Sequence, residues 1–287
     1  MPPTSPAVAS WTLGLRLRRK RENLGITSSQ ASKRAPIAPT YLSDVERGKK
    51  NLSQERLEAL IKLYELPDDE SEQLRLLRQE ANQRGWWARY SAMFSDDLLR
   101  YFGYEHGAET VRSYDGGLVH GLLQTEEYAR AITQAGSPNV RLAEVDRRVE
   151  VRMLRQQRLT GSDPLHLVAV MSEAALRQQV GGAGVLAAQL EHLLDLAERL
   201  PENLDIRVVP YTATGHHAMG GSTFHLVNFP SGDVPALAWQ ETVTSAELIV
   251  DPIRTREYDI AHGEATRSAL NRSTSLELIA ELRSAIG

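Results

Sequence analysis

The sequence predicts a fold of class α plus α/β, with five short N-terminal helices followed by a mixed α/β domain that holds a small sheet of about four strands. Three observations support this prediction. The chain has 287 residues, which is more than one small domain needs. Residues 1–66 carry 12 Lys and Arg against 6 Asp and Glu, whereas the rest of the chain has a net charge of −10. Apolar spacing is helical through the first half and mixes with strand patterns from Pro164.

Composition excludes several classes of protein. The chain contains no cysteine, which rules out disulfides, thiolate zinc sites and cysteine nucleophiles. No apolar run approaches the roughly 18 residues that span a bilayer, and residues 1–10 lack the basic front and apolar core of an export signal. We therefore expect a cytoplasmic protein with no membrane partner and a disordered tail at residues 1–10.

Residues that favour helix starts and ends divide the basic N-terminal part into short helices. Leu13, Leu17 and Leu24 lie on one stripe of a first helix that Gly25 ends, and the remaining faces carry "RLRRKR", which is either a solvated face or a polyanion-binding one. Thr27 can cap a second helix. Pro39 is tolerated near the start of a third helix, because first-turn N–H groups have no partner within the helix. Ser53 caps a fourth helix, and a fifth forms a helical linker at residues 67–87.

Residues 88–287 are predicted to form helices first and then a mixed α/β region. Thr125 can cap a helix whose first turn is acidic, and Val145, Val149 and Met153 mark a core or interface stripe on the next. A parallel pair of strands fits the long crossover between the first two predicted strands, and the later strands can form hairpins. The predicted strands are residues 165–170, 205–211, 222–229 and 235–242.

The stretch "APTYLSDVERGKKNLS", together with the "GIT" that begins the second helix, resembles the helix-turn-helix of the xenobiotic-response-element family, to which the lambda-type phage repressors also belong. The resemblance covers residues 13–66 and gives a domain of residues 11–66. It implies binding to double-stranded DNA, with a partly buried Arg21–Glu46 ion pair; a plain surface pair is the alternative. The DNA-binding residues so predicted are Arg21, Ser28, Ser29, Ala38, Pro39, Thr40, Tyr41, Ser43, Asp44, Arg47, Lys49, Lys50 and Asn51.

The residues expected to face base edges are poor readers of sequence. Thr40 is a tolerant donor or acceptor, and Asp44 can accept only from cytosine N4 while it repels phosphate. The cations that follow Gly48 supply affinity without sequence information. We therefore expect modest base discrimination, with specificity coming from dimerisation, groove shape or a partner. Use of the helix-turn-helix for protein contacts alone is the alternative.

An ordered set of motifs in the second part is similar to one family. "GWW", "GLLQTEEYARA", "VRMLRQQRL", "SEAALRQQVGG" and "IRVVPY" resemble the C-terminal domain of the actinomycete antitoxin-like transcriptional regulators, over residues 85–280. The resemblance implies a nucleoid-associated regulator whose body, residues 88–287, senses a small protein encoded nearby or a ligand. A homodimer is expected because operators commonly have two-fold repeats. The predicted sensing residues are Trp86, Trp87, His120, Leu122, Gln124, Tyr128, His216 and His217.

The sequence gives only weak signals for a phosphate, metal or catalytic site in residues 88–287. "VGGAGV" follows a helix rather than a strand, which favours a helix connection over a phosphate site. The paired histidines of "GHHAMGG" lack a metal-ligand spacing and favour a loop over a zinc site. His225, Glu241 and Glu173 could act as acids or bases, but capping or pairing fits them better. We expect no cofactor, no metal and no enzymatic activity.

Two other functions stay open at this point. One is an adaptor in which both parts of the chain hold proteins. The other is an enzyme that the N-terminal part targets to DNA.

Overall fold

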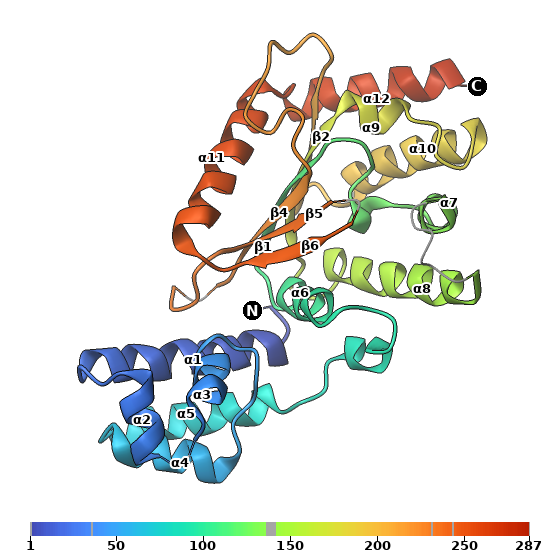
Figure 1. Cartoon of the computed structure of the whole chain (residues 1–287). Helices are drawn as coiled ribbons and strands as arrows, with labels where there is room; N and C mark the ends of the chain where they lie inside the picture. The colour runs from blue at the N-terminus through green and yellow to red at the C-terminus, as the bar shows by residue number, and fades with distance from the viewer. Residues whose placement is uncertain (1, 36, 136–141, 231, 243, 287) are drawn as a thin grey trace. The chain divides into compact units, whose positions relative to one another are not determined.

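The computed structural model (Figure 1) describes every residue except 1, 36, 136–141, 231, 243 and 287. The chain forms two compact units. The N-terminal unit contains residues 3–107 with 231–234, and the C-terminal unit contains residues 108–230 and 235–287 with the first two residues. The division thus falls after Gly107, later in the chain than the predicted boundaries at residues 66 and 87.

The N-terminal unit is helical throughout its main segment. Its α-helices are α1 (Pro6–Asn23), α2 (Ser28–Arg34), α3 (Pro39–Glu46), α4 (Gln54–Leu63), α5 (Asp68–Ala81) and α6 (Asp96–His106), with a short 3-10 helix η1 (Trp86–Tyr90).

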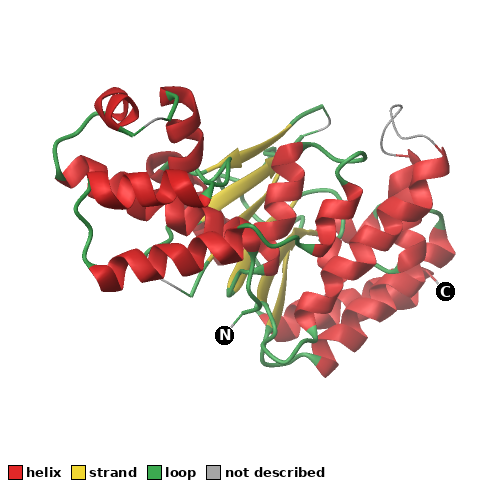
Figure 2. Cartoon of the chain, turned by 90° about the horizontal axis from the view of Figure 1, so that it is seen from below, coloured by secondary structure: helices red, strands yellow, loops and turns green. Residues whose placement is uncertain are grey.

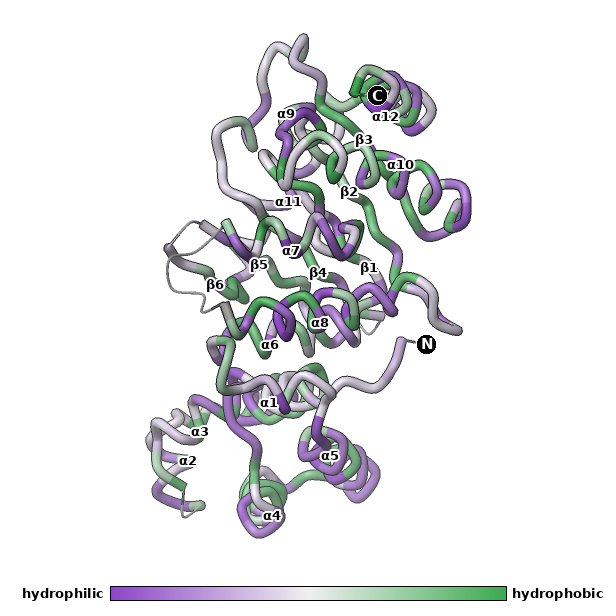
Figure 3. The backbone as a smooth tube through the Cα atoms, turned by 90° about the vertical axis from the view of Figure 1, so that its right-hand side faces the viewer, coloured by the Kyte–Doolittle hydropathy of each residue, from purple (hydrophilic) through white to green (hydrophobic). Residues whose placement is uncertain are grey.

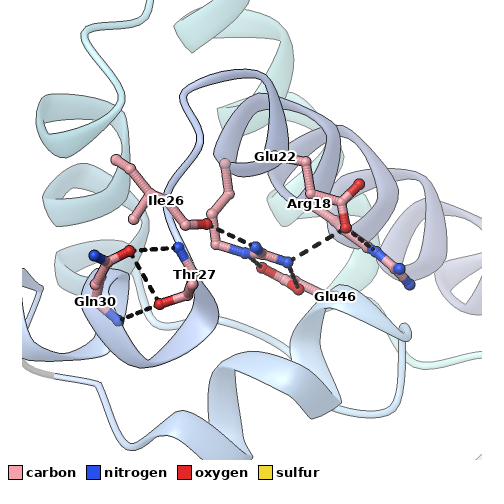
Figure 4. A network of polar contacts seen from close by, with 7 residues as sticks. Arg18, Glu22, Ile26, Thr27, Gln30 and Glu46 are labelled. Carbon is pink, nitrogen blue, oxygen red and sulfur yellow. Dashed lines mark hydrogen bonds and ion pairs between the residues drawn. The ribbon is translucent and has the colours of Figure 1, made fainter.

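Local caps explain where these helices begin. Thr27 and Gln30 form a reciprocal capping box, in which the Gln30 N–H donates to Thr27 Oγ1 at 3.2 Å and the Thr27 N–H donates to Gln30 Oε1 at 2.8 Å (Figure 4). Pro39 is the first residue of α3, as predicted. Pro36, in the turn between α2 and α3, lies outside the described residues.

Two segments are more ordered than the sequence predicted. Helix α1 begins at Pro6 and buries Ala9 and Ser10, so only about half of the predicted tail precedes it. Helix α5, expected as a linker, contributes Leu74 to the same core as Leu17. The hydrophobic cost of leaving such a leucine exposed, roughly 2 kcal/mol, accounts for the docking of α5.

The C-terminal unit is a six-stranded mixed sheet with helices around it. Its strands are β1 (Thr110–Asp115), β2 (His166–Ser172), β3 (Leu204–Val209), β4 (Thr223–Asn228), β5 (Leu237–Glu241) and β6 (Ala246–Ile249). Its α-helices are α7 (Glu126–Ala135), α8 (Val145–Gln156), α9 (Glu173–Arg177), α10 (Ala183–Arg199), α11 (Pro252–Ser268) and α12 (Arg272–Ile286). The 3-10 helices are η2 (Gly121–Leu123), η3 (Leu142–Glu144) and η4 (Gln157–Leu159).

The sheet has the order β3-β2-β1-β4-β5-β6. The predicted parallel pair is confirmed, since β2 and β3 run parallel, and the antiparallel β4–β5 pair confirms a predicted hairpin, to which the unpredicted β6 adds a second antiparallel pair. The prediction of about four strands is wrong, because β1 and β6 were not recognised. Strand β1 lies at the centre, parallel to β2 and antiparallel to β4, and its polar Ser113 and Asp115 interrupt the apolar pattern that marks a buried strand.

Helices cover both sides of this sheet. Helix α11 lies on one side, where Ala265 packs with Tyr114, Phe224 and Leu226, and α7, α8 and α10 lie on the other (Figures 1 and 2). Strand β2 is largely hydrophobic along its length, as Figure 3 shows, because side chains on both of its faces are covered, whereas the edge strand β3 carries the partly exposed Asp205 and Arg207. Side chains alternate along a strand, so Ser113 and Asp115 point away from α11, to the face opposite Tyr114.

Candidate nucleic-acid interface

Helix α3 has a buried side and an exposed start. Leu42 and Val45 are buried in the core of the N-terminal unit. Pro39 and Thr40 are exposed in the first turn, as is Ala38 immediately before it. The amphipathic spacing that buries the two apolar residues therefore leaves the predicted base-facing residues on the solvent side.

The turn after α3 is held in one conformation by Gly48. Its φ of +65° is the left-handed conformation that glycine adopts without strain. A Cβ on Gly48 would also come within 2.8 Å of the Trp11 Cα. The Lys49 N–H donates to the Asp44 carbonyl at 2.7 Å, which closes the turn. Arg47, Lys49 and Lys50 are exposed around this turn, so the cations are held close to the end of α3.

Asp44 is neutralised by one of these cations. The Lys50 ammonium lies 2.9 Å from Asp44 Oδ2. The hydrogen bond from Lys50 holds the pKa of Asp44 below its usual value, and the charge of Lys50 and its neighbours adds to this shift. A neighbouring cation therefore holds Asp44, and that cation is Lys50, with Arg47 contributing only through its charge. Lys50 can contact Asp44 because the turn at Gly48 reverses the chain direction after α3.

Tyr41 organises the far side of the turn. Its hydroxyl donates to the Asn51 carbonyl, and the Arg56 guanidinium lies 4.5 Å from the ring centre. Lys50 lies 5.6 Å from the same ring. Tyr41 thus links α3 to α4 and gathers two cations beside Asp44.

Arg21 lies inside the N-terminal unit. Its Nε and Nη2 donate to the two Glu46 carboxylate oxygens at 2.6 and 2.8 Å, and both residues are buried. The predicted ion pair between α1 and α3 is present, and its burial excludes the alternative of a surface pair (Figure 4). Because the Arg21 guanidinium also donates to the Ile26 carbonyl, Arg21 does not contact phosphate and leaves the predicted interface.

Several other predicted contacts differ in exposure. Ser29 is exposed and Ser43 is half-buried. Ser28 Oγ is shielded from solvent and makes no hydrogen bond within the described part of the chain, so it does not present itself to a phosphate. The Asn51 side chain accepts from Ser10 and donates to the Ala81 carbonyl at 2.7 Å, so it joins helices instead of facing outward.

The predicted sensing residues Trp86 and Trp87 pack within the N-terminal unit, where Trp87 is buried and Trp86 is half-buried. Trp87 is buried, and a Cβ on Gly103 would come within 2.9 Å of its ring. Trp86 stacks on Phe102 at 6.3 Å between ring centres. Neither ring forms an open surface. The pair anchors η1 against α6.

The "GLLQT" residues predicted to line a sensing surface are buried as well. The Gln124 amide donates to the Val119 carbonyl at 2.6 Å, and the Tyr128 hydroxyl accepts the Val119 N–H. Gln189 on α10 donates to the Leu123 carbonyl and accepts the Thr125 N–H. These bonds satisfy backbone groups that no regular element pairs, so the segment is a structural junction of α7 and α10. His120, Leu122, Gln124 and Tyr128 are all almost fully covered.

The loop histidines take different partners. His217 is exposed and its Nδ1 lies 2.6 Å from Glu264 Oε2. His216 is half-buried, its ring lies 5.2 Å from that of Tyr114, and burial lowers its pKa. The two side chains therefore do not converge on one ligand.

A buried polar cluster in the C-terminal unit went unrecognised in the sequence. Asp115 Oδ1 lies 3.8 Å from His225 Nε2, and the His120 and His225 ring centres are 4.6 Å apart. Burial alone raises the pKa of Asp115, but the two histidines and the Ser113 hydroxyl outweigh it and lower the pKa. Asp115 ends a strand that sequence patterning missed, so its proximity to two distant histidines had no sequence signal.

An open groove of about 450 Å³ lies between α7 and α8. Arg130 forms ion pairs with both Glu126 and Asp146 on its rim, and Val149 and Met153 provide apolar lining. Val149 and Met153 were predicted as core or interface positions; Val149 is buried, whereas Met153 is half-buried and lines this groove.

Helices α2 and α3 form a helix-turn-helix, and an exposed basic turn follows α3. Together with a separate α/β unit, this is the architecture of a DNA-binding regulator. The helix-turn-helix domain family matches residues 12–74, which supports this class. The chain belongs to the family whose shared region is described as "Domain of unknown function (DUF5753)", which matches residues 98–281.

Solved structures add a limited comparison. Two crystal structures of the clp gene regulator ClgR from Corynebacterium glutamicum are 23% and 24% identical to the chain, and cover 27% and 34% of it with 96% and 94% of their own length. Both have a TM-score of 0.22, at which the likeness supports no argument about function. No curated protein matches. None of the helices in the described ranges has the length and apolar character needed to cross a bilayer.

Proposed function

We propose that this chain is a transcriptional regulator that binds double-stranded DNA through the exposed start of α3 and the basic turn after it. The observation that carries this proposal is the turn itself. Gly48 fixes the exposed Arg47 and Lys49 at the C-terminal end of α3, while the exposed Thr40 lies at its N-terminal end, so one short helix carries a base-facing start and a phosphate-binding turn.

Electrostatics favour DNA on this unit. Residues 1–66 carry a net charge of +6, whereas the remainder carries −10. A cationic surface supplies affinity for a polyanion by releasing counterions, and the acidic remainder supplies none. No catalytic group is needed for this function.

Base reading by α3 is weak in the proposed function. Asp44 is held by Lys50, so its carboxylate reaches cytosine N4 only if that ion pair opens. Thr40 is the remaining exposed polar side chain in the first turn of α3. A homodimer on two half-sites would supply the missing specificity, as two-fold operators do for other helix-turn-helix proteins.

We further propose that the C-terminal unit senses a partner, such as a small protein encoded nearby, as its antitoxin-like resemblance implies. The buried "GLLQT" segment does not support a surface there. The groove between α7 and α8 supports the proposal better, because its apolar floor is rimmed by the Arg130 ion pairs. A partner that binds there would need about 1 to 3 kcal/mol of coupling to control DNA affinity.

Selection from a randomised duplex library tests the proposed DNA function. The full chain, a variant carrying Arg47→Ala and Lys49→Ala, and a Lys62→Ala control are incubated with the library at fixed salt. Lys62 is an exposed lysine on α4, outside the proposed interface. We expect the wild type and the control to enrich the same sequences and the double variant to lose enrichment. Equal enrichment by all three proteins would contradict the placement of the interface at this turn, and no enrichment by any of them would favour a protein-binding adaptor.

A further inference from the structure

Three ligand-type side chains meet inside the C-terminal unit. Asp115 ends β1, His225 lies on β4, and His120 precedes η2. One potential ligand atom from each lies within 4.8 Å of the other two. The sheet register explains the first two, because His225 pairs with Ser113, and Asp115 follows two residues later on the same face of β1.

The cluster is sealed and one of its members is held in place. Asp115 is 4% exposed, His120 0% and His225 6%. Ser113 Oγ donates to Asp115 Oδ2 at 2.7 Å, while the other carboxylate oxygen, Oδ1, lies 3.8 Å from His225 Nε2. A neighbouring hydroxyl that fixes a carboxylate in this way is a usual second-sphere partner of a metal ligand.

The donor set selects a class of ion. Two imidazole nitrogens with one carboxylate suit zinc and the other divalent transition metals, whereas calcium and magnesium prefer oxygen ligands throughout. Bonds of 2.0–2.1 Å in a tetrahedral arrangement separate ligand atoms by about 3.4 Å. The 3.8 Å between Asp115 Oδ1 and His225 Nε2 is therefore only slightly wider than a loaded site requires.

We propose that Asp115, His120 and His225 bind one divalent transition-metal ion, with zinc the ion that fits best, and that a water or a further ligand completes its coordination. This site is separate from His216 and His217 in the 215–221 loop. The proposal does not depend on DNA binding, because the ligands lie in the C-terminal unit and the test below reads the ion itself.

Ion binding would change the turn at His120. The Nδ1 atom of His120 accepts the Leu122 N–H at 3.2 Å, so the neutral ring carries its proton on Nε2. An ion bound at Nε2 moves that proton to Nδ1, where it opposes the Leu122 N–H. Loading therefore breaks this hydrogen bond and couples the ion to η2, the segment that leads into Gln124.

Zinc titration of the chelator-treated full chain tests the site. Isothermal titration calorimetry should give one ion per chain with a dissociation constant in the micromolar range or tighter. Asp115→Asn and His225→Asn should weaken binding at least 100-fold, and Ser113→Ala by about 10- to 100-fold, the usual cost of losing an outer hydrogen bond to a ligand. His217→Asn is the matched control, because it removes an exposed histidine and should leave the affinity unchanged.

A second measurement uses only the wild type, in case the variants fold poorly. Imidazole nitrogen spectra recorded with and without zinc should show His120 and His225 shifting together, with His120 Nδ1 becoming protonated, while the exposed His166 stays unchanged. The Leu122 amide should shift in the same titration. The absence of saturable zinc binding would overturn the proposal. So would zinc binding that is retained by the Asp115→Asn, His225→Asn and Ser113→Ala variants but lost in the His217→Asn variant.

Discussion

The Lys50 ammonium lies 2.9 Å from the Asp44 carboxylate, so a cation expected to hold DNA is already paired inside the proposed interface. Binding phosphate through Lys50 requires this ion pair to open, and opening it exposes an acid to the DNA backbone. Asp44 and Lys50 therefore act as one unit. Their separate effects on DNA affinity cannot be additive.

A double-mutant cycle on random duplex DNA measures this coupling. We expect Asp44→Asn to raise affinity a few-fold, because it frees Lys50 and removes an acid that repels phosphate. Lys50→Ala should cost more in the wild type than in the Asp44→Asn background, since only the former leaves Asp44 unneutralised. Equal costs in both backgrounds would mean that the ion pair does not persist near DNA.

Asp44→Asn should also change base preference. An asparagine can bond adenine N6 and N7, whereas an aspartate can accept only from cytosine N4. Sequencing of selected operators should show a shift at one base pair per half-site. Thr40→Ala should weaken selected binding by about 1 kcal/mol or slightly more. An unchanged preferred sequence for Asp44→Asn would place this residue away from the bases.

Breaking the buried Arg21–Glu46 pair should strongly destabilise the N-terminal unit. Glu46→Gln leaves the Arg21 guanidinium buried without its counter-charge, at a cost of about 3 to 5 kcal/mol. Replacing both partners, with Arg21→Met and Glu46→Leu, should recover most of that loss. Urea unfolding followed by tryptophan fluorescence reports mainly on this unit, because three of the four tryptophans, Trp11, Trp86 and Trp87, lie within it. A double variant less stable than Glu46→Gln would refute the desolvation argument.

Gln189 should be essential to the junction of α7 and α10. It is fully buried and bonds both the Leu123 carbonyl and the Thr125 N–H. Gln189→Met keeps most of the volume but leaves two backbone groups unsatisfied, which should cost about 2 to 4 kcal/mol. The exposed Gln179→Met is its control and should change the free energy of unfolding by less than about 0.5 kcal/mol.

His262 should make the C-terminal unit sensitive to mild acid. Burial, aided by the Arg112 charge, lowers its pKa to about 4. The unfolded chain, with a histidine pKa of about 6.5, binds the proton more strongly, so stability is complete above that pH and is lost as pH falls toward 4. Between pH 7.5 and 5.0 the loss is about 2 kcal/mol. Urea titrations at both pH values should show this loss shrinking in His262→Leu and persisting in the exposed His166→Gln.

The helices were predictable because their signals are local. Thr27, Pro39 and Ser53 begin helices in the structure where capping rules place them. The parallel pairing of β2 and β3 followed from the length of the crossover between them. Strand β1 was missed because Ser113 and Asp115 are polar at buried central positions, and a strand that carries a polar cluster violates the pattern by which buried strands are recognised.

The candidate surfaces were less predictable than the elements. Sequence patterning placed Lys49 in the turn after Gly48, where it is exposed, but it could not show that Lys50 folds back onto Asp44 or that Asn51 bonds Ser10. The "GLLQT" motif was assigned to a surface because it was expected in a loop. Its partner Gln189 is 65 residues away from Gln124, and such long-range hydrogen bonds leave no local signal.

Salt-dependent binding of the full chain to duplex DNA tests the central claim most directly. Dissociation constants are measured between about 50 and 200 mM salt for the wild type, Lys49→Ala and Lys62→Ala, on selected and random sequences. The account predicts that Lys49→Ala weakens binding to both and lowers the slope of log affinity against log salt by about 0.9, the contribution of one phosphate contact, while Lys62→Ala changes neither. A Lys49→Ala slope equal to that of the wild type would contradict the placement of the DNA interface at the turn after α3.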